Sequence, residues 1–473
     1  MAARGHVLAL LVLLALASVT AASGGRHPHQ HRHRHGRKSA RLRLIPSAPG
    51  ASLADRARDD RHRHAYIRST LASRRRAAEV GASAFAMPLS SGAYTGTGQY
   101  FVRFRVGTPA QPFVLVADTG SDLTWVKCRG AAGSPPDAQP PAREFRPAAS
   151  KSWAPIACSS DTCTSYVPFS LANCSTPASP CAYDYRYKDG SAARGVVGTD
   201  SATIALSGNG RAGVGADSSR RAKLQGVVLG CTASYDSQSF QSSDGVLSLG
   251  NSNISFASRA AARFGGRFSY CLVDHLAPRN ATSYLTFGPG PEDAAAPSPA
   301  SAPPAPEQTP LLLDRRMSPF YAVTVDTVYV AGEALDIPAD VWDVERKGGA
   351  ILDSGTSLTI LATPAYKAVV AALSKQFAGL PRVSMDPFEY CYNWTAGAPE
   401  IPELEVHFAG SARLLPPAKS YVIDAAPGVK CIGVQEGAWP GVSVIGNILQ
   451  QEHLWEFDLR DRWLRFKHTR CAQ

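Results

Sequence analysis

A short motif containing an aspartate occurs twice in the chain, each time directly after an apolar run. The two copies read Val116-Ala117-Asp118-Thr119-Gly120-Ser121 and Ile351-Leu352-Asp353-Ser354-Gly355-Thr356. One copy alone would indicate no more than an Asp-initiated turn in which glycine supplies a positive backbone angle. The repetition, with a second hydroxyl residue after each glycine, favours a pseudo-two-fold architecture that contributes one carboxylate from each half.

Two carboxylates that approach within hydrogen-bond distance cannot both ionise, so they share one proton and titrate in two separate steps. The ionised partner can take a proton from a water molecule that attacks an amide carbonyl, while the protonated partner donates to the carbonyl oxygen. We therefore expect Asp118 and Asp353 to be catalytic and to need no metal or cofactor. The flanking residues would orient the pair, with Ser121 and Thr356 bonding the outer carboxylate oxygens; this orienting set is Thr119, Gly120, Ser121, Ser354, Gly355 and Thr356.

Short strand-like segments dominate the chain after residue 98 and indicate a mainly β fold in two parts. The clearest helix spans residues 363–377, with Thr363 as a capping residue, Pro364 in the first turn and Gly379 as the stop signal. Downstream of each aspartate lies an apolar-apolar-small triplet. The expected strands are residues 100–106, 113–117, 226–229, 284–287, 321–330, 350–352, 421–423, 442–445 and 463–466.

These motifs closely resemble those of pepsin-like aspartic proteases of the plant nepenthesin-like branch. The matching stretches are VADTGSDLTWVKC, YKDGS, SDGVLSLG, ILDSGTSLT and VIGN, and the resemblance extends from about Gly98 to Cys471. It implies a bilobal, mainly β fold with pseudo-two-fold symmetry and an active-site cleft between the lobes. It also implies that Thr119 and Ser354 cross-link the two catalytic loops, that Tyr187 is the flap tyrosine over the substrate, and that Trp125 is its hydrogen-bonding partner. Trp125 could equally be a core aromatic, and Tyr187 an ordinary strand tyrosine.

The ten cysteines fit the same branch, because Cys158, Cys163, Cys174 and Cys181 lie ahead of Tyr187 like the cysteine-rich insertion of nepenthesin-like enzymes. The sequence alone leaves their connectivity open. By resemblance the implied pairs are Cys158–Cys181, Cys163–Cys174, Cys128–Cys231, Cys271–Cys471 and Cys391–Cys431.

Two positions depart from the family pattern. Lys188 stands where a glycine usually follows the flap tyrosine, and this change implies altered specificity. Ser248 occupies the place of a glycine, and its extra atoms are expected to press on the first catalytic loop unless that loop shifts slightly; the sequence leaves open whether activity is reduced.

The amino-terminal region has the pattern of an exported precursor. Residues 1–22 predict a signal peptide rather than a membrane anchor, because the apolar run is too short to span a bilayer. An even number of cysteines agrees with export. So do four N-x-S/T glycosylation acceptors, Asn173, Asn253, Asn280 and Asn393.

Residues 23–88 form a basic segment with 15 Lys+Arg against 4 Asp+Glu, whereas the chain from Leu89 onward holds 33 against 34. A nucleic-acid partner is therefore disfavoured, despite the arginine run at 74–76. We interpret this segment as a removable pro-segment that lies over an acidic site and contains a histidine pH switch. Its histidines could also bind metal, but a solvated tail is the preferred alternative.

The sequence thus predicts a monomeric, secreted aspartic endopeptidase of the cell wall or apoplast, with a vacuolar location as an alternative, acting on polypeptides at acidic pH. The competing hypothesis is a catalytically weak or inactive, inhibitor-like binding protein on the same scaffold. The expected domains are an N-terminal lobe at 89–288 with an insertion at 128–181 and a flap near 187, a Pro/Ala-rich linker at 289–310 and a C-terminal lobe at 311–473.

Overall fold

The computed structural model describes most of the chain after residue 99 and part of the basic segment. Described are residues 40–46, seven positions between 53 and 68 (53, 57, 60, 63, 64, 67 and 68), 100–132, 143–167, 176–186, 192–205, 221–235, 243–275, 277, 283–288, 306–395 and 398–471. The predicted signal peptide, Tyr187, Lys188, Cys174, Asn173 and Asn280 lie outside these residues. Asn253 and Asn393 are exposed.

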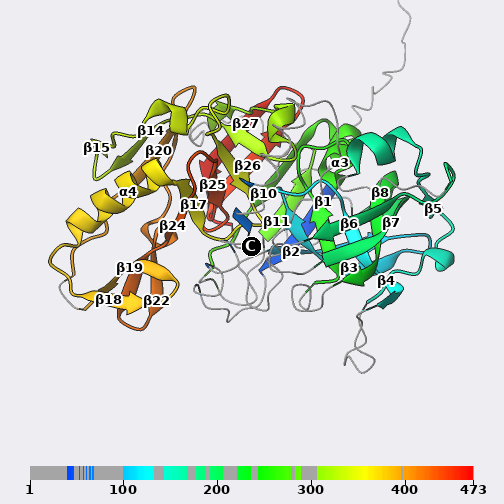
Figure 1. The fold of residues 1–473 in the computed structure, drawn as a ribbon, viewed down its shortest axis with the longest axis horizontal. Coiled ribbons are helices and arrows are strands. Elements are labelled where there is room, and N and C mark those ends of the chain that lie inside the picture. Colours follow the sequence, from blue (N-terminus) through cyan, green and yellow to red (C-terminus); the bar gives the residue numbers. More distant parts are fainter. Residues whose placement is uncertain are drawn as a thin grey trace, which may run out of the picture. The chain divides into compact units, whose positions relative to one another are not determined.

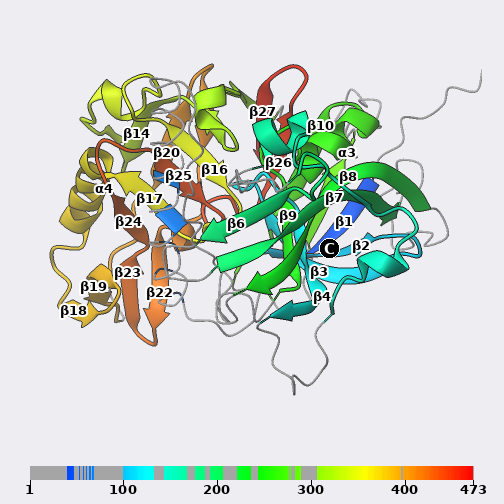
Figure 2. The same ribbon diagram turned by 45° about the vertical axis from the view of Figure 1, so that its right-hand side comes forward.

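The described chain from residue 40 onward is mainly β and forms the two lobes of a pepsin-like fold (Figure 1). A 14-stranded sheet runs from the N-terminal lobe through the region between the lobes. Its N-terminal-lobe strands are β2 (Tyr100–Val106), β3 (Gln111–Asp118), β4 (Trp125–Ala132), β5 (Ala154–Pro155), β6 (Ala182–Arg186), β7 (Ala192–Ala205), β8 (Arg221–Tyr235) and β9 (Gly245–Ser248). Figure 2 shows the β6–β7 hairpin extending from this lobe toward the C-terminal lobe.

The part of this sheet between the lobes combines strands from distant parts of the sequence. A stacked pair of rings, Phe268 and Phe457, with centroids 4.6 Å apart, packs across neighbouring strands of this region. The strands are β1 (Ala40–Pro46), β10 (Arg267–Cys271), β11 (Ser283–Phe287), β12 (Glu307–Pro310), β26 (His453–Asp458) and β27 (Trp463–His468). β12 occupies the last four residues of the segment 289–310, which the sequence analysis interprets as a loop or linker.

The C-terminal lobe is built from three smaller sheets. The first holds β13 (Tyr321–Val323), β16 (Ala350–Asp353), β17 (Thr359–Ala362), β24 (Val434–Gly437) and β25 (Ser443–Gly446). The second holds β14 (Val325–Val330), β15 (Glu333–Ala334), β20 (Leu404–Phe408) and β21 (Ala412–Leu414), and the third β18 (Arg382–Met385), β19 (Phe388–Asn393), β22 (Val422–Ala426) and β23 (Val429–Ile432). The predicted strand at 321–330 is therefore two strands in different sheets.

The two halves repeat one strand arrangement around the aspartates. β3 runs parallel to β9 and places Asp118 opposite Ser248, and β16 runs parallel to β25 and places Asp353 opposite Gly446. In the N-terminal half, β4 follows the motif and pairs antiparallel with β9 and parallel with β8. In the C-terminal half, β17 pairs antiparallel with β25 and parallel with β24 in the same way. This repetition is the structural form of the duplicated sequence motif.

Two α-helices of the lobes cover the sheets. α4 (Thr363–Gln376) buries Tyr366, Val369, Val370 and Leu373 on one face. The residue before it, Ala362, occupies the cap position, and the Thr363 hydroxyl donates instead to the Gly437 carbonyl at 2.8 Å, so the predicted Thr363 cap was wrong. α3 (Phe256–Phe264), which the sequence analysis missed, is capped by the Ser255 hydroxyl. Short helices are η1 (Pro147–Ala149), η2 (Thr162–Tyr166), η3 (Arg315–Met317), η4 (Ala339–Val341) and η5 (Ala418–Ser420).

The disulfides correct one part of the sequence interpretation. Cys163 bonds Cys181, with their Cα atoms 5.8 Å apart, so the predicted pairs Cys158–Cys181 and Cys163–Cys174 are wrong. The physical reason is that η2 carries Cys163 into the same buried cluster as Cys181 and Tyr183. The remaining bonds within the described residues are Cys128–Cys231, Cys271–Cys471 and Cys391–Cys431.

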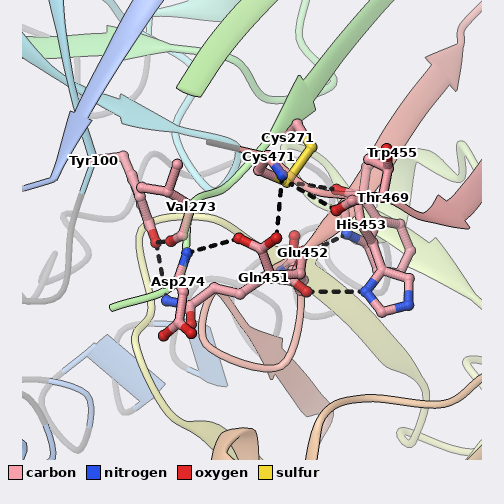
Figure 3. The surroundings of a disulfide bond; sticks show 11 residues. Tyr100, Cys271, Val273, Asp274, Gln451, Glu452, His453, Trp455, Thr469 and Cys471 are labelled. Atoms are coloured by element: carbon pink, nitrogen blue, oxygen red, sulfur yellow. Dashed lines mark hydrogen bonds between the residues drawn. A yellow bond between two sulfur atoms is a disulfide. The ribbon is translucent and has the colours of Figure 1, made fainter. Parts of the chain in front are cut away.

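The Cys271–Cys471 bond ties the end of the chain to the sheet between the lobes (Figure 3). Beside it, the Glu452 carboxylate accepts hydrogen bonds from the backbone N–H groups of Asp274 and Cys471, both at 3.1 Å. A single side chain therefore joins both segments that the disulfide connects.

Candidate active site

The two motif aspartates lie at the ends of β3 and β16, one in each lobe, and are 4% and 0% exposed. Their carboxylates converge on the guanidinium of Arg63. Arg63 Nε donates to Asp353 Oδ2 at 2.5 Å, and Nη2 donates to Asp353 Oδ1 at 2.7 Å and also to Asp118 Oδ1. Residues that are 235 positions apart in the sequence thus face one cation.

The loop after each aspartate has the same local geometry. The N–H of Gly120 donates to Asp118 Oδ1 and the N–H of Gly355 donates to Asp353 Oδ1, both at 2.9 Å. A Cβ at Gly120 would lie 3.0 Å from Asp353 Oδ1, and one at Gly355 would lie 2.6 Å from Asp118 Oδ1. Each glycine therefore gives the opposite carboxylate the space to approach.

The residues after the aspartates link the two loops. The Ser354 N–H donates to the Thr119 hydroxyl at 2.9 Å, and the Thr119 N–H donates to the Ser354 hydroxyl at 3.1 Å. The two hydroxyls donate onward across the lobes, Thr119 to the Leu352 carbonyl and Ser354 to the Ala117 carbonyl. Four buried hydrogen bonds between the lobes therefore restrict the motion of one aspartate relative to the other.

The two trailing hydroxyls are not equivalent. The Thr356 hydroxyl donates to Asp353 Oδ2 at 2.7 Å. The Ser121 hydroxyl donates to the main-chain oxygen of Asp118 at 3.4 Å, and a hydrogen bond from the Ser121 side chain also lowers the pKa of the Asp118 carboxyl. Ser121 therefore divides its interactions between the main chain and the side chain of Asp118.

Burial and charge act against each other at this site. Burial raises the pKa of the Asp118 carboxyl, the Arg63 guanidinium lowers it and the Asp353 charge raises it, with a net pKa above the ordinary value. Burial lowers the pKa of Arg63, but the Asp118 and Asp353 carboxylates outweigh it and raise that pKa. The buried cation therefore depends on both aspartates for its charge compensation.

Arg63 belongs to a set of helical residues that lie in the cleft. The residues described in this segment are helical, and all of them except Arg68 are buried. Asp60 accepts hydrogen bonds from the N–H groups of Ser357 (2.6 Å) and Leu358. His64 Nε2 lies 3.1 Å from the Val442 carbonyl oxygen. The sequence analysis placed a basic pro-segment over the site but singled out none of these residues, because no motif distinguishes them from the other charged residues of the segment.

Comparisons with known proteins identify the family. Residues 100–289 and 320–468 match family models described as Xylanase inhibitor N-terminal and Xylanase inhibitor C-terminal. Aspartyl protease family protein 2 of Arabidopsis thaliana is 32% identical over 396 residues, 82% of this chain and 74% of that protein. Aspartic proteinase nepenthesin-2 of Nepenthes gracilis is 29% identical, over 80% of this chain and 79% of that protein. This chain belongs to the pepsin-like aspartic protease family, in its nepenthesin-like branch.

Solved structures share the fold of this protease-family chain at lower identity. The structure of edgp aligns with a TM-score of 0.59 at 20% identity, covering 80% of this chain and 93% of that one. Basic 7S globulin from soybean aligns with a TM-score of 0.57 at 20% identity, covering 79% and 92%.

The family departure at Ser248 does not press on the catalytic loop. Its side chain is fully buried, and its hydroxyl lies 2.8 Å from the Thr124 hydroxyl and accepts from the Phe256 N–H at 3.1 Å. At the equivalent position of the other half, a Cβ on Gly446 would lie 2.5 Å from the Leu358 carbonyl carbon. The first half has room for a serine where the second does not, so the expected clash was wrong.

Trp125, the expected partner of the flap tyrosine, is 2% exposed and packs in the buried cluster that contains Tyr183 and Ile67.

Within the described part of the chain, no group of three or more His, Cys, Asp or Glu side chains could hold a metal ion. No described helix is long and apolar enough to cross a membrane.

Proposed function

We propose that the chain is the precursor of an exported aspartic endopeptidase that hydrolyses peptide bonds at acidic pH. Asp118 and Asp353 would activate a water molecule held between them. The observation that carries this proposal is the convergence of both carboxylates on the Arg63 guanidinium, because groups that face one cation can also face one water molecule and share one proton.

The catalytic step follows from the surroundings of the pair. With Arg63 withdrawn, two buried carboxylates at close range retain one proton between them. The ionised carboxylate takes a proton from the water as its oxygen attacks the scissile carbonyl, and the protonated one donates to the carbonyl oxygen. Thr356 and the glycine N–H groups hold the carboxylates by hydrogen bonds, so that little reorganisation is needed when charge moves.

We further propose that residues 23–88 are a pro-segment that keeps the precursor inactive. Arg63 occupies the position of the water, and Asp60 binds the backbone of the second catalytic loop. The cleft is therefore closed by three adjacent side chains of one helical face, those of Asp60, Arg63 and His64. Removal of this segment, together with a signal peptide at 1–22, would yield a mature enzyme with disulfides suited to the cell wall or the vacuole.

The alternative is a binding protein on the same scaffold, weak or inactive as a protease and similar to inhibitors of other enzymes. The descriptions of the matching family models, both of which refer to xylanase inhibitors, favour it. The intact Asp-hydroxyl-Gly sequence in both motifs and the mutual approach of the two aspartates favour catalysis instead.

One assay separates the two functions. The purified precursor is incubated at acidic pH and tested for cleavage of a denatured protein at about pH 3–5, where a shared-proton pair works. We expect shortening of the precursor and cleavage that a dyad-directed transition-state peptide abolishes. The Asp118→Asn variant should show neither. If wild-type protein and this variant behave alike, the endopeptidase proposal is refuted and the binding protein is favoured.

A further inference from the structure

A cavity of about 410 Å³ lies in the C-terminal lobe between α4, the β18–β19 hairpin and β24. We call it the 366–436 pocket after its outermost residues. Its walls are Tyr366, Ser384, residues 386–389 and residues 434–436. Phe388 and Val434 are buried and Pro387 is half-buried, so part of the wall is apolar.

The charged groups that line this pocket are acidic. Asp386, Glu389 and Glu436 line it and are exposed, and its described wall includes no lysine, arginine or histidine. The Tyr366 hydroxyl donates to Glu389 Oε2 at 3.0 Å. Burial raises the pKa of Tyr366, and Glu389 and Glu436 raise it further, which places their negative charge inside the pocket.

A basic residue lies close by but is held elsewhere. Arg382 donates to the Glu389 main-chain oxygen at 2.7 Å, and its guanidinium lies 4.6 Å from the centre of the Tyr390 ring. It therefore stacks on Tyr390 and binds the Glu389 main chain, while the Glu389 carboxylate accepts hydrogen bonds from the Tyr366 and Tyr390 hydroxyls.

The rim of the pocket already binds a peptide backbone. Gln435 Nε2 donates to the Ala57 carbonyl at 2.6 Å. The Gln435 side chain is 8% exposed, and its Oε1 has no hydrogen-bond partner in the described structure. The Gln435 side chain thus binds the main chain of the proposed pro-segment through its N–H, while its buried carbonyl oxygen accepts no hydrogen bond within the described structure.

The pocket lies within reach of a substrate bound at the aspartates. Ala57 and Arg63 are both helical and are six positions apart, which corresponds to about 9 Å along a helix axis at 1.5 Å per residue. An extended peptide advances about 3.3 Å per residue. A side chain about three residues from the scissile bond would therefore reach the pocket.

We propose that the 366–436 pocket is a substrate subsite for a cationic side chain, arginine or lysine, about three residues from the scissile bond. This inference rests on the proposed endopeptidase function. The alkyl stem would pack on Phe388 and Val434, as long basic side chains do on apolar surface. The charged head would meet Glu389 and Glu436, and the fork of a guanidinium suits carboxylate oxygens best.

The test uses octapeptides that carry arginine or its neutral isostere citrulline at one position at a time. The acid-treated protein is assayed at about pH 4.5, near the upper step of a shared-proton pair. At one position about three residues from the cleaved bond, we expect kcat/KM to favour arginine about tenfold. In a Glu389→Gln/Glu436→Gln variant this ratio should fall to about one, whereas the surface control Glu333→Gln should retain it.

The outcomes separate the subsite from the catalytic proposal. A ratio below about two at every position, with all peptides cleaved, overturns the subsite and leaves the endopeptidase standing. Absence of cleavage of any peptide, as in Asp118→Asn, overturns the endopeptidase and the subsite with it. Should the double variant fail to fold, Glu436→Lys provides the second measurement. That variant must favour glutamate over glutamine at the same position, and equal rates would overturn the subsite.

Discussion

Replacement of Arg63 by glutamine should open the precursor at neutral pH. The Arg63 side chain is 4% exposed and makes three charge-assisted hydrogen bonds to the two aspartates. Removing one partner of a buried ion pair destabilises by about 3–5 kcal/mol. Since each 1.4 kcal/mol is a factor of ten, the open fraction of the precursor should rise by a factor of about 100 to about 4,000.

The assay is the binding of a fluorescent transition-state peptide to uncleaved precursor at pH 7. The apparent Kd equals the intrinsic Kd divided by the open fraction, so it should tighten by the same factor until the cleft is fully open. The matched control is Arg68→Gln, since Arg68 is also helical but exposed. We expect its Kd to stay within about threefold of the wild-type value. Equal affinities for the Arg63→Gln and Arg68→Gln precursors would refute the reasoning.

Three further predictions concern the same site. Asp118→Asn should lower kcat by at least about 10³ after acid treatment, because the remaining carboxyl group, that of Asp353, cannot be the base and the proton donor at the same time. Residual activity above 10% would contradict this prediction. Burial lowers the pKa of His64 to about 4 when the segment is docked, whereas a His in the released segment has its ordinary pKa of about 6.5. Between these values the released His64 binds a proton and the docked His64 does not. Docking therefore weakens as pH falls from about 6.5 to about 4. Burial raises the pKa of Asp60 to about 7, so acid strengthens docking through Asp60 in part of the same pH range. The test therefore compares two precursors in the same binding assay. The open fraction of a His64→Gln precursor should rise less steeply with acid than that of the wild type. Ser248→Gly should lower the free energy of unfolding by about 1–3 kcal/mol in urea titrations, because the buried Phe256 N–H loses its acceptor and the Thr124 hydroxyl keeps only the N–H of residue 248 as a partner; an unchanged midpoint would refute the role of Ser248.

The architecture could be predicted because it repeats. Two apolar strands that end in Asp-hydroxyl-Gly leave few ways to place the aspartates other than on a common axis, and the structure forms β3 and β16 at these strands. The strand boundaries of β14 and of the long β8 could not be predicted, since they depend on which neighbour each residue pairs with.

Other features depend on contacts that are distant in sequence. α3 is the exception, because its Ser255 cap and its apolar face of Phe256, Ala257, Ala260, Ala261 and Phe264 are local signals that could have predicted it; it packs on β8 and β10. The Cys163–Cys181 bond depends on where η2 docks. Arg63 is one of 15 Lys+Arg residues in its segment, and only the position of the helical face distinguishes it.

The strand β1 makes release of the pro-segment more than the emptying of a cleft. It lies between β2 and β11, and its backbone pairs with both. If residues 40–46 leave, β2 and β11 each lose a partner strand, and their N–H and C=O groups on that side are unpaired. Unpaired strand edges of this kind tend to pair with other strands. On the proposed removal of the pro-segment, we therefore expect the position of β1 in the sheet to be filled by the new amino terminus or by a strand of another molecule.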